Sequence, residues 1–129
     1  MIERYLQTQL DAVAASPLVR SSNVSFDKRT LDAGLIRGEL TFADGSCLHF
    51  RELVEMQARV IRIMYSYHYQ REDGLLVFRY DDTPHFPTLP QFPHHKHIGS
   101  QAEAIPSQSP DLITILREIE AMYPVSNVS

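Results

Sequence analysis

The chain has 129 residues, of which 43% are hydrophobic and 22% charged, and its net charge is −4. This length is close to that of one typical domain, so we expect a single domain over residues 1–129. The composition is too apolar for a wholly disordered chain. The acidic balance also excludes a strong positive field over the whole surface, which leaves only a local basic patch for nucleic acid.

The chain start and the cysteine content bear on the compartment. The first residues, MIERYLQTQL, lack the basic and apolar regions of a signal peptide, and no apolar run approaches the roughly 20 residues that a membrane span needs. The one cysteine, Cys47, cannot form an intrachain disulfide. We therefore expect a cytoplasmic protein without membrane contact.

A helix followed by a hairpin is expected in the first part of the chain. Apolar residues recur at steps of three and four, which predicts an amphipathic helix through Ile2, Tyr5, Leu6, Leu10 and Val13. Alternating apolar residues then predict a strand through Leu40, and the turn ADGS leads into the next strand. If residues 43–45 form a three-residue loop with Gly45 left-handed, Leu40 faces Leu48 and Gly38 faces Phe50.

A second hairpin is expected from RVIRIMYSYHYQ, the turn REDG and LLVFRYD, because β-branched and aromatic residues are abundant there. With an even loop length, one face is apolar and is expected to be core: Ile61, Ile63, Tyr65, Tyr67, Tyr69, Leu76, Phe78 and Tyr80. The opposite face is polar: Arg62, Ser66, His68, Gln70, Arg79 and Asp81.

A Pro/His-rich loop is expected at about residues 82–101, because the four prolines in DDTPHFPTLPQFPHHKHIGS disfavour both helix and central strand. We expect Pro84 to Gly99 to pack against the polar face of the second hairpin, since the histidines need anchoring to form a site. The stretch SPDLITILREIEAMY predicts a final helix, with Ser109 as N-cap and Pro110 at the first helical position.

These elements predict an α+β fold. It consists of an antiparallel meander of about five strands, with N-terminal and C-terminal helices packed on one face. An aromatic-rich sheet with an unpaired edge also favours a two-fold homodimer.

Three stretches carry a family resemblance: DGSCLHFRELVE, YSYHYQ and GLLVFRYDDTPHFPTLPQFPHHKHIG. The most specific part is FRYD, followed by PH and then by FPHHKH. Over about residues 35–120 the chain resembles the TumE family. The resemblance implies a TumE-like domain that acts as the growth-inhibiting toxin of a bacterial toxin–antitoxin pair. It also implies a cognate antitoxin, often a small helix-turn-helix DNA-binding protein, and it assigns no catalytic residue.

The histidines indicate a candidate site for chemistry on RNA. Cleavage by attack of the 2′-hydroxyl needs a base, an acid and a cation for the phosphate. His68 and Arg79 share the polar face of the second hairpin, and the Pro/His-rich loop leaves from its end. We assign catalysis to His68, His85, His95 and His97, phosphate binding to Arg79 and Lys96, and a supporting role to Asp81.

Two alternatives stay open. His95 and His97 alternate along an extended segment and with His85 could hold a metal ion, although our assignment contains no metal and no cofactor. In the other alternative, the loop and the aromatic face bind a target without catalysis. Cys47 and His49 are interpreted as ordinary strand residues, and Glu52 as a residue at the sheet surface or edge that could act as a general base.

Overall fold

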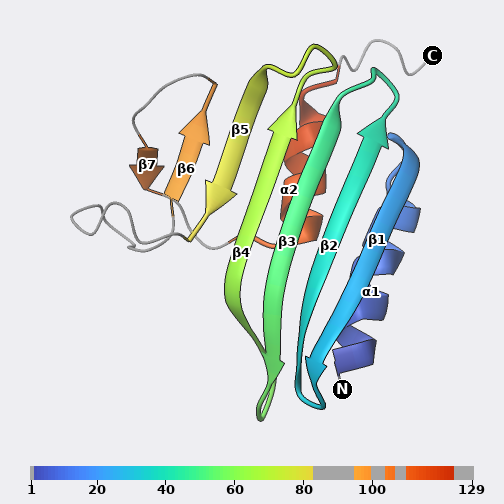
Figure 1. Ribbon diagram of the computed structural model, residues 1–129. Coiled ribbons are helices and arrows are strands. Elements are labelled where there is room, and N and C mark those ends of the chain that lie inside the picture. Colours follow the sequence, from blue (N-terminus) through green and yellow to red (C-terminus); the bar gives the residue numbers. More distant parts are fainter. Residues whose placement is uncertain (1, 83–94, 100–103, 107–109, 124–129) are drawn as a thin grey trace.

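The computed structural model describes residues 2–82, 95–99, 104–106 and 110–123 (Figure 1). The elements in chain order are α1 (Ile2–Ala15), β1 (Val19–Thr30), β2 (Ala33–Phe42), β3 (Cys47–Met56), β4 (Val60–Gln70), β5 (Leu76–Asp81), β6 (His95–Ile98), β7 (Ala104–Pro106) and α2 (Leu112–Ala121). Within these residues the strands form one sheet in the order β1-β2-β3-β4-β5-β6-β7, and every neighbouring pair is antiparallel. Both helices cover the same face of the sheet, with α1 behind β1 and α2 behind the central strands in the view of Figure 1.

The predicted α+β meander with both helices on one face is confirmed. The sheet is wider than the predicted five strands because β6 forms within the segment where a loop was expected, and β7 follows shortly after it. The four prolines of that segment all precede His95, so the sequence HKHI keeps its backbone donors and pairs with β5. Pro106 lies in β7 at the sheet edge, where proline is tolerated.

The turn between β2 and β3 has the predicted geometry. Gly45 has a φ of 85°, and its amide donates to the carbonyl of Phe42 at 3.0 Å. The register then pairs Leu40 with Leu48 and Gly38 with Phe50, as expected for the three-residue loop. Leu40, Leu48 and Phe50 are buried against the helices.

Two irregularities displace part of the predicted face pattern in the second hairpin. Tyr65, Tyr67, Tyr69, Phe78 and Tyr80 belong to the core side, as predicted. The shift in pairing between Leu53 opposite Met64 and Val54 opposite Arg62 adds one residue to β4. The prediction was therefore wrong for three residues at this end of β4. Arg62 turns to the core side, and Ile63 is 46% exposed. Ile61 pairs with Glu55, which lies on the side of β3 opposite to buried Val54, so Ile61 is also on the open side.

A second shift in pairing lies at the start of β5. Tyr69 pairs with Phe78, whereas Gln70 pairs with Leu76, so Val77 is the additional residue. Val77 packs against the core in place of Leu76, and the prediction for Leu76 was wrong for this reason. Period-two alternation cannot reveal a bulge, because each bulge reverses the faces beyond it.

The final helix begins later than predicted. Asp111 is the N-cap, and its carboxylate accepts a hydrogen bond of 2.8 Å from the amide of Thr114. Ser109, the predicted N-cap, lies outside the described residues. Both residue types are favoured at this position, and the sequence alone did not distinguish them. Within the described residues, no helix is long and apolar enough to cross a membrane.

Candidate functional site

The sheet face opposite the helices, here called the open face, carries a row of polar side chains across five strands. The members pair in turn across β2, β3, β4, β5 and β6: Glu39, His49, His68, Arg79 and His97. Directly opposite residues project from the same side of a sheet. The register therefore brings together side chains that are far apart in sequence, and we call this set the open-face row.

Arg79 is the cation at the centre of the predicted site, and its guanidinium is held in place by two neighbours. Its Nε donates to Oδ2 of Asp81 at 2.9 Å, and its Nη1 lies 3.4 Å from Nδ1 of His68. The Asp81 side chain is only 6% exposed, whereas that of Arg79 is 39% exposed. A buried carboxylate thus orients a guanidinium that remains open to solvent, and a guanidinium is well suited to bind a phosphate group.

The contacts of His68 define its hydrogen-bonding state. Nδ1 accepts from Arg79, so Nε2 carries the proton and donates to Oε1 of Gln70 at 3.1 Å. The pKa of His68 is lowered, chiefly by burial. The hydrogen bond to Gln70 opposes this shift, while the positive charges of Arg79 and His49 add to it. His68 is therefore neutral near pH 7 and can accept a proton.

The remaining predicted histidines are described to different extents. His97 pairs with Arg79 from β6 and is half-buried. His95 pairs with Asp81 through its backbone. His85 and most of the predicted loop lie outside the described residues. The structure thus brings together His68, Arg79, Asp81 and His97.

Lys96 lies on the other side of β6, away from Arg79. Its ammonium donates to Oε2 of Glu118 in α2 at 2.7 Å and lies 4.7 Å from the centre of the Tyr80 ring. Burial alone would lower the pKa of Lys96, but hydrogen bonds with Glu118 and Tyr80 raise it above its usual value. Lys96 is thus a charged link between β6 and α2, because alternate residues of a strand face opposite sides.

Two arginines extend the cationic surface beyond the predicted residues. Arg37 and Arg51 are exposed and pair with each other across β2 and β3, and Arg51 also pairs with Ser66 on β4. Arg51 and Arg79 border one cavity of about 130 Å³, whose lining includes the apolar side chains of Leu35, Leu53 and Met64. The sequence did not reveal this group, because finding it requires the register between β3 and β4.

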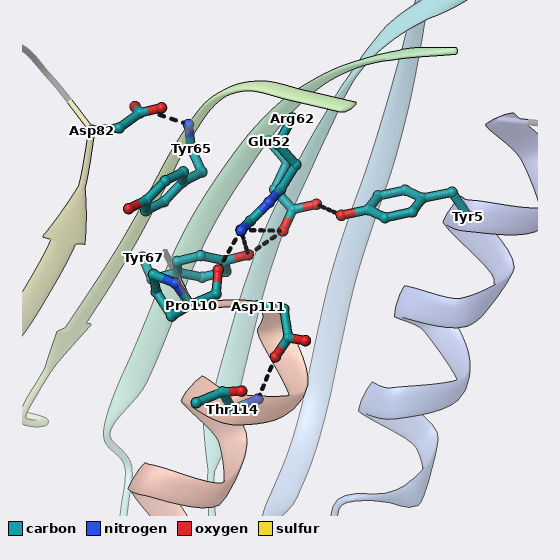
Figure 2. Close-up of polar contacts among 9 residues, drawn as sticks. All are labelled: Tyr5, Glu52, Arg62, Tyr65, Tyr67, Asp82, Pro110, Asp111 and Thr114. Atoms are coloured by element: carbon teal, nitrogen blue, oxygen red, sulfur yellow. Dashed lines mark hydrogen bonds and ion pairs between the residues drawn. The ribbon is translucent and has the colours of Figure 1, made fainter. Parts of the chain in front are cut away.

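A second polar cluster lies under the helices, where Glu52 is completely buried (Figure 2). Its Oε1 accepts from the hydroxyl of Tyr5 at 2.5 Å, and its Oε2 accepts from the hydroxyl of Tyr67. Nη1 of Arg62 lies 3.8 Å from Oε2 of Glu52 and donates to the hydroxyl of Tyr67 and to the carbonyl of Pro110. The cluster connects α1, β3, β4 and the segment that enters α2.

The buried cluster has a structural role. Burial, followed by the negative charge of Glu52, raises the pKa values of Tyr5 and Tyr67, so both phenols stay protonated and donate. The expectation that Glu52 lies on the surface or edge of the sheet was wrong. Side chains alternate along β3, so Glu52 projects to the core side, whereas His49 and Arg51 project to the open face. A polymeric substrate cannot reach its carboxylate.

Comparison with known families places the chain in a class of toxins. The family described as Toxin TumE matches residues 9–123, which is most of the chain. The chain belongs to the TumE family, as the resemblance of its histidine-rich stretches implied. A toxin of this kind implies an antitoxin partner. Comparisons with curated proteins and with solved structures gave no match.

Proposed function

We propose that this TumE toxin acts on RNA and cleaves it by histidine acid–base catalysis on the open face. The observation that carries the proposal is the position of Arg79 between His68 on β4 and His97 on β6. Neighbouring strands are about 4.8 Å apart, so a phosphate bound at Arg79 would have an imidazole on either side. This is the arrangement that a base and an acid need on opposite sides of a phosphodiester.

The proposed reaction begins when a phosphate competes for the guanidinium of Arg79. The contact between Nη1 and His68 is long at 3.4 Å, whereas the bond from Nε to Asp81 is 2.9 Å. Arg79 can therefore turn its Nη groups to the phosphate while it stays anchored through Nε. Nδ1 of His68 is then released to accept a proton.

The proposed cleavage takes up one proton and gives up one proton, and it needs no metal ion. His68 takes the proton of the 2′-hydroxyl as that oxygen bonds to phosphorus, and protonated His97 gives a proton to the 5′-oxygen as the bond between phosphorus and this oxygen breaks. The products are a 2′,3′-cyclic phosphate and a 5′-hydroxyl. Arg79 stabilises the charge on the phosphoryl oxygens during the step. His95 and His85 are further candidates for the acid, and Arg37 and Arg51 would bind flanking phosphates of a single strand.

The test is to map RNA ends in cells that express the toxin or its variants. His68→Ala, His97→Ala and Arg79→Ala should each abolish toxicity and the new 5′-hydroxyl ends. Arg29→Ala is the matched control, because Arg29 is an exposed arginine paired with Asp27 on β1, and β2 and β3 separate β1 from the strands of the three substituted residues. Full toxicity without new RNA ends would contradict the proposal.

A non-enzymatic function is the second candidate, and exposed apolar side chains favour it. Ile63 and Met64 are 46% and 56% exposed, and Met64 borders the same cavity as Arg51. Such a group next to arginines is typical of protein interaction surfaces. In that case Ile63→Ser with Met64→Ser should abolish toxicity, whereas His68→Ala should have little effect.

We also propose that the toxin is a cytoplasmic homodimer and that its antitoxin is a small helix-turn-helix DNA-binding protein. The long strand β1, which among the described strands pairs with β2 alone, supports the dimer. Co-purification with the product of the adjacent gene tests the antitoxin assignment. A neighbouring product without a DNA-binding domain would overturn it.

A further inference from the structure

Three side chains with metal-binding donor atoms meet on the open face near the β2–β3 turn. Glu39 on β2 pairs with His49 on β3, and Cys47 lies two residues before His49 on the same face. Sγ of Cys47 is 3.4 Å from Nε2 of His49, and Oε2 of Glu39 is 3.8 Å from Nδ1 of His49. One donor atom of each residue lies within 4.8 Å of the others.

The donor set and its spacing suit a borderline-soft divalent cation. Zinc in proteins is bound by thiolate, imidazole and carboxylate groups in a tetrahedral arrangement. Zinc–sulfur and zinc–nitrogen bond lengths of about 2.3 Å and 2.0 Å place the two donors about 3.5 Å apart. The separation of Cys47 and His49 therefore already matches one edge of such a site.

The remaining adjustment is small and falls on exposed side chains. The side chains of Glu39 and His49 are 59% and 45% exposed, so their rotamers can close the wider separations. The backbones of Glu39, Cys47 and His49 are fixed by the ladder between β2 and β3. The thiol ligand selects against magnesium and calcium, which prefer oxygen donors.

We propose that Glu39, Cys47 and His49 bind a divalent transition-metal ion, zinc by the chemistry of its ligands, with the fourth position open to solvent. This site goes beyond the proposed function, which uses no metal, and it does not depend on RNA cleavage. Cys47 binds as a thiolate, so its proton passes to solvent when the metal binds. The site is not evident from the sequence, because Glu39 joins Cys47 and His49 only through the strand register.

Cobalt(II) binding to the purified, reduced protein tests the site. A cobalt ion bound by a thiolate gives a sulfur-to-metal charge-transfer band. Cys47 is the one cysteine of the chain, so this band reports on Cys47 alone. We expect the band to saturate at one ion per chain and to disappear on addition of zinc. Zinc should also protect Cys47 from alkylation by iodoacetamide.

Single substitutions distinguish this site from the other histidines. Cys47→Ser should abolish the band, and Glu39→Gln and His49→Gln should each weaken cobalt binding about tenfold or more. Glu55→Gln, in the same strand as His49, is the matched control and should bind as the parent does. Circular dichroism establishes that each variant is folded. Cobalt binding without a thiolate band, no binding at all, or a band unchanged in both Glu39→Gln and His49→Gln would overturn the proposal.

Discussion

Arg79 lies directly opposite His68 in the sheet, and its Nη1 is 3.4 Å from Nδ1 of His68. The guanidinium therefore contacts the lone pair that the proposed base would use, while Asp81 holds the same guanidinium through Nε. The cation and the base are coupled, so a change in either alters the other.

Arg79→Lys should lower RNA cleavage about 10²-fold, although it keeps the positive charge. Lysine has one ammonium group and cannot bond to Asp81 through one nitrogen while offering others to a phosphate. Cleavage rates of purified protein on a single-stranded RNA measure the effect, with Arg29→Lys as the matched control. Parent-level cleavage by Arg79→Lys would show that charge alone is sufficient.

The pKa of His68 should lie below its ordinary value of 6.5. Burial is the main cause, and the charge of Arg79 adds to it. In Arg79→Gln the pKa should therefore move upward. Because the proposed base must be neutral, the loss of cleavage by the parent on the acidic side should follow this lowered pKa of His68. NMR titration of the His68 ring measures both values, and an unchanged pKa in Arg79→Gln would contradict the coupling.

Glu52→Gln should strongly destabilise the fold, because it leaves the charge of Arg62 without its carboxylate partner beneath the helices. Breaking a buried ion pair by removing one partner costs about 3–5 kcal/mol. Urea unfolding measures the free energy of unfolding. Glu55→Gln, on the same strand and partly exposed, is the control and should change stability by less than about 0.5 kcal/mol. Equal stability of the two variants would rule out an energetic role for the buried cluster.

Much of the fold follows from local sequence signals. The turn around Gly45 specified the register of Leu40 with Leu48, since a three-residue loop fixes which residues face each other. Alternation placed Tyr67 and Phe78 in the core correctly. Alternation placed Arg62 on the wrong face, because the bulge in β4 interrupts the period of two and the residue types there do not indicate a bulge.

The candidate site was predictable only within one hairpin. His68, Arg79 and Asp81 belong to consecutive strands joined by a short turn, so their common face could be inferred from sequence. Arg51 joins them through the pairing of β3 with β4, whose register shifts at the extra residue of β4. Lys96 was grouped with them because its segment was expected to be a loop, whereas strand pairing turns it toward Glu118.

Gly38→Ala should destabilise the protein, because the Phe50 ring lies against Gly38. A Cβ at this position would be 2.0 Å from Cε1 of Phe50. Overpacking of this kind typically costs about 1–3 kcal/mol. Phe50→Leu should reduce the cost of Gly38→Ala, so the double variant should be more stable than the sum of the single effects predicts. Additive effects in urea unfolding would contradict this close packing.

Light scattering should report a dimer at high micromolar concentration if the proposed homodimer forms. β1 is the longest strand and pairs on one side only within the described sheet, so it offers a row of backbone donors and acceptors. Proline in the middle of β1, at a residue whose amide points away from β2, should weaken the dimer by removing a donor. A monomer at the same concentration would contradict the proposed assembly.

Strand β6 connects the two sides of the molecule. Lys96 is bonded to Glu118 of α2 behind the sheet, while the next residue, His97, pairs with Arg79 in front. A ligand that shifts α2 would therefore displace the backbone of β6, which positions His97, without contacting the open face. Glu118→Gln tests this connection, since it should reduce cleavage although the substituted side chain lies on the far side of the sheet. An antitoxin that binds α2 would in this way inhibit the toxin without covering the open face.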